Sequence, residues 1–367
     1  MTNNMKSMFR LVAILGIGVI LAGCATSSPA EVVEPTTENG ALVINGEEIA
    51  DAELFAAAQA EGELLFYGTF AKPIMDAVIE EFTADTGIKV EHVRLQGPPM
   101  YERIMTELGA NQLKADVFDF TDISLAEKLY AAGLYEDHVV PADADIPADM
   151  KHYNGGFYTI SRALFGIAYN TALLDPADVP TDLDSLLDPK YSGQLGLTTI
   201  KSNTLWGNYI ALYDAKGEEY WSGLAAQQPR FYDSVTLLTE DLVRGEITVA
   251  LGHVGSVVQL IKDGAPIAIL LDPTAISAPA HLGGLSSKAE HPNAAKVFLN
   301  WRLSARGSQV FADESNEYPS NPNYQVPDLE GVSIPHPDDA RIFTPTVTDL
   351  TDRRLELEPR WNQIFGR

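Results

Sequence analysis

Three strand–loop–helix units follow one another in the first part of this chain. Short apolar runs suited to buried strands lie at 64–67, 88–95 and 115–120, and each precedes a loop and a stretch with apolar residues at helical spacing. Consecutive units of this kind form a parallel sheet with right-handed crossovers, so their three loops lie at the same sheet edge. The pattern therefore predicts an α/β fold rather than a helical bundle.

A fourth unit, at 244–262, has the same design. The run 247–251 is rich in β-branched residues and fits a strand buried on both faces, as in a parallel sheet, and an apolar helical face follows it. The loop between them reads Gly-His-Val-Gly-Ser at 252–256. Ligands of open α/β sheets bind at the carboxyl ends of strands and against helix N-termini, so His253 and Ser256 are candidate ligand contacts. The alternative is a tight turn whose glycines serve only the backbone.

Polar residues also recur in the other loops that meet predicted helices. Beside His253 and Ser256, the candidate ligand-binding residues are Thr69, Phe70, Gln96, Thr121, Asp122, Lys201, Ser202, Asn203, Ser234, Thr274 and Tyr318. For Thr121 and Asp122 the alternative is plain capping of the helix that follows. For Lys201 the alternative is a solvated surface charge.

Length and charge restrict the classes of function. A chain of 367 residues can form two lobes of ordinary domain size. The formal net charge of −26 repels phosphate backbones, so we expect no nucleic-acid partner. The acidity does not make the ligand a cation, because a site can differ in charge from the rest of the surface.

Catalytic motifs are missing from the sequence. It contains no His-Glu-x-x-His, no cysteine pair, no Gly-x-Ser-x-Gly and no phosphate-binding Gly-x-x-x-x-Gly-Lys loop. His253 lies near Ser256, but no orienting acid can be assigned to the pair. We therefore expect a protein that is not an enzyme and that uses no cofactor and no resident metal.

The N-terminus predicts export and lipid attachment. Lys6 and Arg10 precede the apolar run 11–21, which is too short to span a membrane and is typical of a secretory signal. The run leads into Leu-Ala-Gly-Cys at 21–24, which resembles the bacterial lipobox. That resemblance implies cleavage before Cys24 and lipidation of this residue. The alternative is a free thiol after an ordinary signal; as the chain's one cysteine, Cys24 cannot form an intramolecular disulfide.

The order of several short motifs resembles one protein family. In chain order they are Ala-Glu-Gly-Glu-Leu at 60–64, Phe-Thr-Ala-Asp-Thr-Gly-Ile-Lys-Val at 82–90, Ala-Asp-Val-Phe at 115–118, Gly-Ile-Ala-Tyr-Asn at 166–170, Asp-Pro-Lys-Tyr-Ser-Gly at 188–193, Arg-Gly-Glu at 244–246, His-Pro-Asn-Ala-Ala at 291–295 and Asn-Glu-Tyr-Pro at 316–319. Over residues 57 to about 324 this order is similar to that of the extracellular solute-binding proteins of bacterial ABC importers, in the ferric-iron-type branch.

The resemblance implies a fold, a role and a location. The fold is the two-lobed α/β periplasmic-binding-protein type II fold, whose lobes are joined by crossing strands and close on a ligand in the cleft. The role is to capture a solute and deliver it to ABC permease subunits, as a monomer that catalyses no reaction. The protein would be anchored in the cell envelope through Cys24, with its body in the periplasm or outside the cell. The expected organisation is a lipoprotein signal peptide at 1–23, a flexible tether at 24–49, a first lobe from 50–153 with 272–315, and a second lobe from 154–271 with 316–367.

The ligand does not carry over from the family. In its ferric-binding members adjacent tyrosines supply phenolate ligands in the loop that corresponds to 252–256, where this chain has no tyrosine. The hydroxyl- and amide-rich loops favour a small polar organic solute instead. Helix N-termini, Lys201 and His253 favour an anionic group on it, such as phosphate, phosphonate or carboxylate. The alternatives are a binding protein for ferric iron or an iron chelate, and a ligand-sensing lipoprotein.

Overall fold

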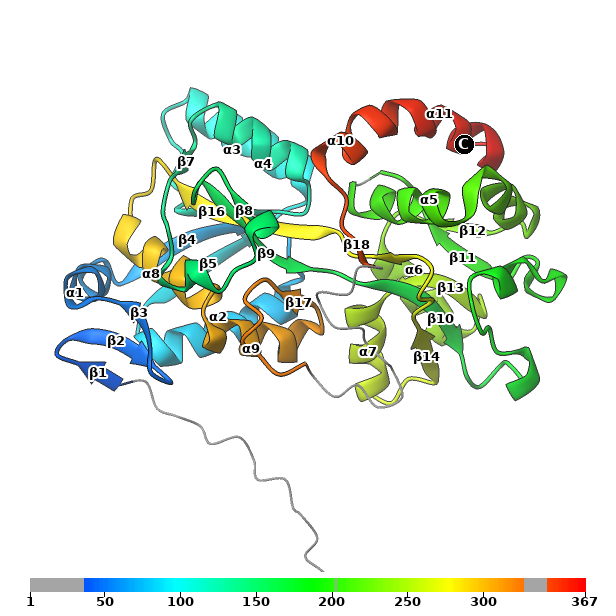
Figure 1. The fold of residues 1–367 in the computed structure, drawn as a ribbon, viewed down its shortest axis with the longest axis horizontal. Helices are drawn as coiled ribbons and strands as arrows, with labels where there is room; N and C mark the ends of the chain where they lie inside the picture. Colours follow the sequence, from blue (N-terminus) through cyan, green and yellow to red (C-terminus); the bar gives the residue numbers. More distant parts are fainter. Residues whose placement is uncertain (1–35, 202, 327–341) are drawn as a thin grey trace, which may run out of the picture. The chain divides into compact units, whose positions relative to one another are not determined.

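The computed structural model describes residues 36–201, 203–326 and 342–367, all of which lie within one compact unit, Glu34–Arg367. The predicted signal peptide at 1–23 and the predicted lipidation site, Cys24, lie outside these residues. Two separate large sheets, each flanked by helices, form two lobes (Figure 1). No helix in the described part of the chain is long and apolar enough to cross a membrane.

The first lobe is built on an eight-stranded mixed sheet. Its main strand order is β17-β9-β16-β6-β4-β5, with β7 paired to β16 and β8 to β9. The strands are β4 (Glu63–Gly68), β5 (Lys89–Arg94), β6 (Val117–Phe120), β7 (Tyr135–Glu136), β8 (Lys151–His152), β9 (Phe157–Arg162), β16 (Ala280–Ser286) and β17 (Tyr318–Pro319). Its helices are α1 (Ala52–Glu61), α2 (Lys72–Thr86), α3 (Gly97–Gly109), α4 (Ile123–Ala131), α8 (Pro292–Arg302) and α9 (Ala305–Ser315), with short 3-10 turns at Pro141–Ala144 and Ala148–Met150. Strand β4 pairs in parallel with both β5 and β6, which confirms the predicted parallel arrangement of the first three units.

The second lobe is built on a five-stranded sheet with the order β12-β11-β13-β10-β14. These strands are β10 (Phe165–Asn170), β11 (Leu195–Thr198), β12 (Arg230–Tyr232), β13 (Val249–His253) and β14 (Ile267–Leu270). The helices are α5 (Asn203–Ala226), α6 (Val235–Arg244), α7 (Val254–Lys262), α10 (Val347–Leu350) and α11 (Asp352–Phe365), with 3-10 turns at Pro176–Asp178, Asp184–Leu187 and Pro189–Tyr191. Strand β13 is parallel to β11 but antiparallel to β10, so the sheet is mixed rather than purely parallel.

Two described segments join the lobes. One runs from β9 directly into β10, and the other from the short strand β15 (Ile276–Ser277), which pairs with β18 (Ile342–Phe343), into β16. In Figure 1, β9 and β16 run side by side from the first lobe toward the second, in agreement with their antiparallel pairing.

The lobe boundaries differ from those expected. Both β9 and β17 belong to the sheet of the first lobe, whereas residues 154–271 and 316–367 were expected in the second. The difference arises because β9 pairs with β16, more than 100 residues away along the chain. Such a long-range pairing leaves no local pattern in the sequence.

Residues expected in a flexible tether form a small antiparallel sheet. Its strands are β1 (Thr36–Glu38), β2 (Ala41–Ile44) and β3 (Glu47–Ala50). Leu42, Ile44 and Ile49 are buried in the core of the first lobe. The predicted tether at 24–49 is therefore wrong for its described part, 36–49.

Two Asn-Gly pairs explain why this segment folds. Asn39 and Gly40 have positive φ angles of 52° and 91°, and Asn45 and Gly46 have 55° and 81°. Two adjacent positive φ values define the type I′ turn that joins tightly paired strands, and Asn-Gly is its preferred sequence. The four residues between these turns, Ala41–Ile44, are all apolar and alternate only in burial, so the Asn-Gly pairs were the hairpin signal in a segment whose overall composition suggested disorder.

Leu42→Ala should lower the free energy of unfolding by about 2–5 kcal/mol, because it leaves a cavity in the first lobe's core. Chemical denaturation of the purified body measures this change. Glu48→Ala, at an exposed position of the same small sheet, is the matched control and should change stability by less than about 0.5 kcal/mol. If 36–50 did not pack on the body, both substitutions would be neutral.

Candidate functional site

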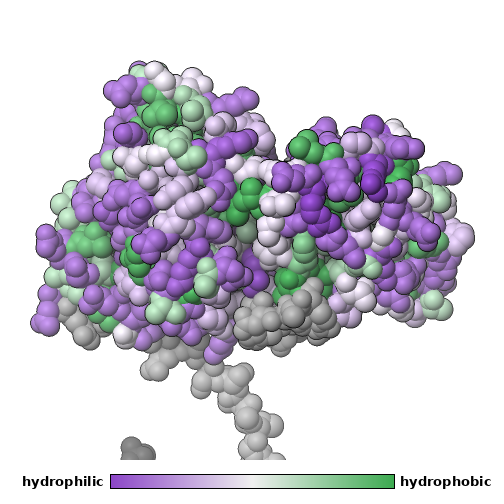
Figure 2. Space-filling view, turned by 45° about the horizontal axis from the view of Figure 1, so that its top comes forward, coloured by the Kyte–Doolittle hydropathy of each residue, from purple (hydrophilic) through white to green (hydrophobic). Residues whose placement is uncertain are grey.

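A cleft of about 660 Å³ lies between the lobes and is the candidate site. This volume is in the range of cavities that hold small organic ligands. Figure 2 shows the hollow where the two lobes meet, with hydrophobic groups among the polar ones. The lining residues from the first lobe are Thr69, Phe70, Ala71, Ile74, Arg94, Gln96, Gly97, Pro98, Pro99, Thr121, Asp122, His281 and Glu317, and those from the crossing segment and second lobe are Ala163, Phe165, Lys201, Leu205, Asp233, Ser234, Val235, Thr236, His253, Ser256 and Arg354.

Most of the predicted site residues come together in this cleft. Those that line it are Thr69, Phe70, Gln96, Thr121, Asp122, Lys201, Ser234, His253 and Ser256. Thr274 lies elsewhere, where its N–H and hydroxyl donate to Asp272 Oδ1 at 2.7 and 2.6 Å. Tyr318 is also outside the lining and is buried in a core cluster with residues of the second lobe. Ser202 lies outside the described residues, and Asn203 is the first residue of α5.

Strand order explains why loops far apart in sequence meet here. The β4–α2, β5–α3 and β6–α4 loops leave the carboxyl ends of three neighbouring strands of the first sheet. Across the cleft, the loops that enter α6 and α7 leave β12 and β13 of the second sheet. This is the edge at which open α/β sheets bind ligands.

Two predicted residues are helix caps as well as cleft residues. The Ser124 N–H and hydroxyl donate to Asp122 Oδ1 at 2.9 and 2.7 Å, so Asp122 caps α4. The Ser234 hydroxyl accepts a hydrogen bond from the Leu237 N–H at 3.2 Å and caps α6. These bonds satisfy helix ends that would otherwise be unpaired.

His253 is engaged by the fold rather than free for a ligand. The Ser256 N–H donates to His253 Nδ1 at 3.1 Å, so His253 is the N-cap of α7 and carries its proton on Nε2. Nε2 lies 3.4 Å from Glu317 Oε1. Two of the donors expected to face a ligand, the Ser256 N–H and the imidazole N–H, are therefore directed at protein atoms.

The first turn of α7 is closed by the end of α9. A Cβ placed on Gly255 would lie 2.2 Å from the Ser315 carbonyl oxygen, far inside a van der Waals contact. Gly255 is therefore required for close packing of these two helices. The Val254 N–H of the same turn donates to the Leu164 carbonyl at 2.8 Å, so together with the Ser256 N–H two backbone donors of this turn are already engaged.

Glu317 is the buried acid at the base of the cleft, and it is only 5% exposed. The Ser161 hydroxyl donates to its Oε2 at 2.8 Å, and His281 Nε2 lies 3.7 Å from Oε1. Burial by itself raises the pKa of Glu317, but His281, His253 and Ser161 outweigh burial and hold this pKa below its usual value. Polar partners from both lobes thus keep the carboxylate ionised. Sequence reasoning missed this role, although the motif at 316–319 contained the residue.

Phe70 is positioned by buried polar groups behind it. Its ring stacks on His281 with centroids 4.0 Å apart, and the Arg302 guanidinium lies 5.6 Å from the ring centre. Arg302 Nη1 in turn donates to Asp119 Oδ2 at 3.1 Å, and both residues are buried. Burial raises the pKa of Asp119 to about 7, and this nearby cation opposes the rise.

The cations around the cleft differ in how they are paired. Lys201 Nζ lies 2.5 Å from Asp233 Oδ2, and Arg354 donates to Glu358 and to the Ile200 carbonyl. Arg94 donates its Nε–H to the Phe70 carbonyl at 3.0 Å, and no ion pair among the described residues includes it. The Arg94 guanidinium is therefore the cleft cation that has no carboxylate partner in the described part of the chain. The sequence signal was its position as the last residue of a strand at the ligand edge.

The cleft lining offers few free side chains that could bind a metal ion. It contains no tyrosine, and the described residues hold no group of three or more His, Cys, Asp or Glu side chains arranged for a metal ion. The anionic oxygens near its base belong to Glu317, which already has three protein partners.

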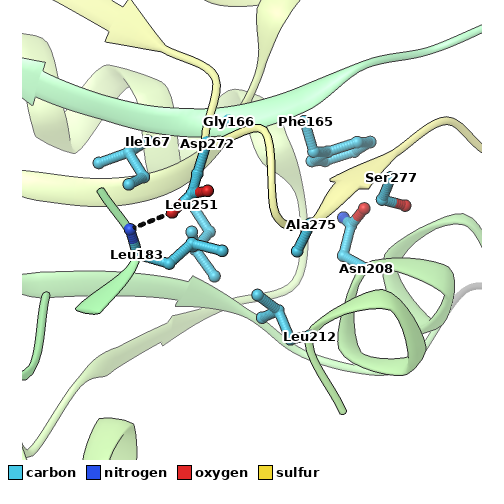
Figure 3. A pocket seen from close by; sticks show the side chains of 10 residues that line it. All are labelled: Phe165, Gly166, Ile167, Leu183, Asn208, Leu212, Leu251, Asp272, Ala275 and Ser277. Carbon is cyan, nitrogen blue, oxygen red and sulfur yellow. Dashed lines mark hydrogen bonds between the residues drawn. The ribbon is translucent and has the colours of Figure 1, made fainter. Parts of the chain in front are cut away.

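A second cavity lies inside the second lobe, behind Phe165 (Figure 3). Its volume of about 20 Å³ suits one water molecule and excludes an organic solute. Asn208 Oδ1 and Ser277 Oγ are buried and lack a hydrogen-bond partner among the described residues, and both side chains lie at this cavity. A cavity of this size beside two such polar atoms suits a bound water molecule, so we regard it as structural.

Comparison with known proteins supports the architecture. The sequence family described as bacterial extracellular solute-binding protein matches residues 77–332. The major ferric iron-binding protein of Neisseria meningitidis serogroup A is 26% identical over 292 residues, which cover 74% of this chain and 85% of that protein. Iron uptake protein A1 of Synechocystis sp. is 24% identical over 258 residues, which cover 65% of this chain and 70% of that protein.

Solved structures share the fold at lower sequence identity. Iron-bound HitA from Pseudomonas aeruginosa superposes with a TM-score of 0.67 at 22% identity, covering 82% of this chain and 99% of that chain. The periplasmic binding protein AfuA from Actinobacillus pleuropneumoniae, with fructose-6-phosphate bound, gives a TM-score of 0.69 at 18% identity, covering 83% and 99%. These similarities confirm the predicted two-lobed periplasmic-binding-protein fold.

His281→Gln should flatten the fall in stability between about pH 6.5 and pH 4. Burial lowers the pKa of His281 to about 4, whereas the unfolded chain protonates near 6.5. The unfolded state therefore binds more protons in this window, and the free energy of unfolding decreases as the pH falls. Removing the imidazole should remove up to about 3 kcal/mol of that loss, measured by urea unfolding at a series of pH values.

The neighbouring groups act in known directions, and Glu317 responds to the substitution as well, because His281 is one of the groups that lower its pKa. The stabilisation from Glu317 is present above its unfolded pKa and is lost at more acidic pH, as its lowered pKa is passed. Asp119, with a raised pKa, acts in the opposite direction from about pH 7 downward in both proteins. His253 and Arg302 face His281 in both as well. An unchanged pH slope in the variant would mean that His281 is not buried as a neutral ring.

Proposed function

This chain belongs to the bacterial extracellular solute-binding protein family, and we propose that its cleft captures a small polar organic solute that carries an anionic group. The protein then delivers this solute to the permease of an ABC importer and binds it without chemical turnover. The observation that carries the proposal is the two-sided cleft, whose described lining includes Arg94 without a carboxylate partner and contains no phenolic ligand.

Arg94 supports an anionic group on the solute. The guanidinium is fixed by its bond to the Phe70 carbonyl, and its remaining N–H groups form no ion pair among the described residues. Arginine also binds carboxylate, phosphonate and phosphate in a bidentate manner. Gln96, exposed in the same loop region, can add a neutral donor.

Ferric iron is the competing cargo, because several relatives are named for iron. Fe(III) is a hard cation that prefers several anionic oxygen ligands. The lining has no tyrosine, and its carboxylates are engaged: Asp122 caps a helix, Asp233 pairs with Lys201, and Glu317 accepts from Ser161. These commitments favour an organic solute over the bare ion.

Arg94→Gln should weaken binding of the anionic solute about ten- to hundredfold, since a hydrogen bond to a charged group contributes about 1.5–3 kcal/mol. Candidates are found by thermal-shift screening of phosphonates, sugar phosphates and carboxylates, and affinity is then measured by calorimetry. Lys89→Gln is the matched control: it removes the same charge from the opposite end of β5, outside the cleft. The control should bind as tightly as the unsubstituted protein.

Ferric citrate serves as the opposing test in the same screen. Without a tyrosine in the cleft we expect no visible absorption band and no large thermal shift with this compound. A coloured, tight iron complex would overturn the proposal in favour of iron transport. Steady chemical conversion of any bound solute would instead indicate an enzyme.

The protein is further proposed to act as a monomeric lipoprotein anchored through Cys24 after removal of residues 1–23. The support is the charged start, the short apolar run and the lipobox-like Leu-Ala-Gly-Cys. Cys24→Ser should then release the body into the soluble envelope fraction. Immunoblotting of fractionated cells measures this release. Partition of the variant with membranes would contradict the anchor.

A protein that senses the solute rather than importing it would share all these properties. Deletion of a neighbouring permease gene distinguishes the two functions, because only an importer would lose uptake of the solute.

A further inference from the structure

We propose that the solute is amphipathic: its anionic group lies at Arg94, and an aromatic or branched hydrocarbon part lies between two apolar walls of the cleft. This inference rests on the proposed function and narrows its substrate class. Two sets of observations carry it, namely the apolar side chains on both sides of the cleft and the reduced number of free backbone donors at the N-termini of α2, α3 and α7.

The wall on the side of the second lobe is a separate apolar cluster. Ala163, Phe165 and Leu205 pack together with Val235 and belong to neither of the second lobe's two main cores. All four residues line the cleft. They come from the segment that runs from β9 into β10 and from the first turns of α5 and α6. At these positions a site for a fully polar solute would present hydroxyl or amide groups.

The wall on the side of the first lobe is formed by the first turns of α2 and α3. Ala71, Pro98 and Pro99 are exposed, Ile74 is half-buried, and all four line the cleft. Hydrocarbon is thus left accessible on this side of the cleft, next to the buried ring of Phe70. Contact with an apolar group would remove this surface from water.

The prolines also remove hydrogen-bond donors. The first intrahelical bond of α3 is from the Met100 N–H to the Gln96 carbonyl, so the free N–H groups would belong to residues 97–99. Two of these three residues are proline and have no N–H. In α2 the second residue is also proline. Proline rings therefore replace one N–H group in the first turn of α2 and two in the first turn of α3.

The N-terminus of α7 adds few free donors. The Val254 N–H donates to the Leu164 carbonyl, the Ser256 N–H donates to His253 Nδ1, and the cap His253 is directed at Glu317. A sugar ring with several hydroxyl groups would therefore lose hydrogen bonds to water that these walls cannot replace. An aromatic ring or a branched hydrocarbon chain has no hydrogen bonds to water to lose there. Each methylene group that becomes fully buried strengthens binding roughly fourfold.

Calorimetry with matched anions tests the inference on the whole mature body. The pairs are methylphosphonate with phenylphosphonate, and acetate with phenylacetate, and glucose 6-phosphate is the polar comparison. We expect each aromatic anion to bind at least about tenfold more tightly than its small partner and than the sugar phosphate. The aromatic anions should also give a more negative heat-capacity change, the signature of apolar burial.

Two variants probe the two walls. Val235→Thr keeps the size of the side chain but adds a hydroxyl, so it should weaken aromatic anions about three- to tenfold and leave the small anions unchanged. Val243→Thr on the same helix, outside the cleft, is the matched control and should change neither. Pro99→Ser restores an N–H and removes the ring, so it should weaken the aromatic anions while methylphosphonate binds as well or better.

The outcomes separate this inference from the proposed function. If methylphosphonate or glucose 6-phosphate binds as tightly as the aromatic anions, the apolar walls do not select the solute; the inference fails while the anion-binding proposal stands. If no anion in either series binds, both fail. Equal losses for aromatic and small anions in Val235→Thr and Pro99→Ser would show damage to the cleft as a whole and would also overturn the inference.

Discussion

The buried carboxylate of Glu317 holds the junction of this protein together. It accepts a hydrogen bond from Ser161 on β9, lies near His281 on β16, and lies 3.4 Å from the Nε2 of His253 at the end of β13. An ionised carboxylate at 5% exposure is stable only when such partners replace its hydration. One side chain therefore ties the crossing strands of the first sheet to a ligand-edge loop of the second.

This interaction determines what the cleft can offer to a solute. Because His253 turns its N–H toward Glu317 and caps α7 with its other nitrogen, the loop that looked most suited to grip an anion is internally satisfied. Because His281 is held as a neutral ring, Phe70 can stack on it and form part of the cleft surface. The groups left facing the cleft are an arginine, several hydroxyl and amide groups, and a large share of hydrocarbon.

Because of this arrangement, the ligand of this chain does not follow directly from the ligands of its relatives. Proteins named for ferric iron and a structure with fructose-6-phosphate bound share its fold at 26% identity or less. A shared fold positions loops at the sheet edges but does not choose the side chains on them. Here those loops carry prolines and small apolar residues on one side and the Phe165 cluster on the other.

Local sequence patterns were sufficient for the fold class, and they predicted many residues of the candidate site. Apolar periodicity defined the strand–loop–helix units, and strand order then brought nine of the thirteen predicted ligand-binding residues to one cleft. Two Asn-Gly turns were equally local, and the tether prediction failed because composition was given more weight than those turns.

The sequence could not show which hydrogen-bond donors remain free for a ligand. The His253–Glu317 contact joins residues 64 positions apart, the packing of Gly255 on Ser315 joins 60, and the pairing of β9 with β16 joins more than 100. Contacts at such separations are selected by the folding of the whole chain and leave no periodicity in any one segment. The chemistry of the cleft was therefore decided only in the tertiary structure, where buried polar groups had to find partners and thereby ceased to be available to a ligand.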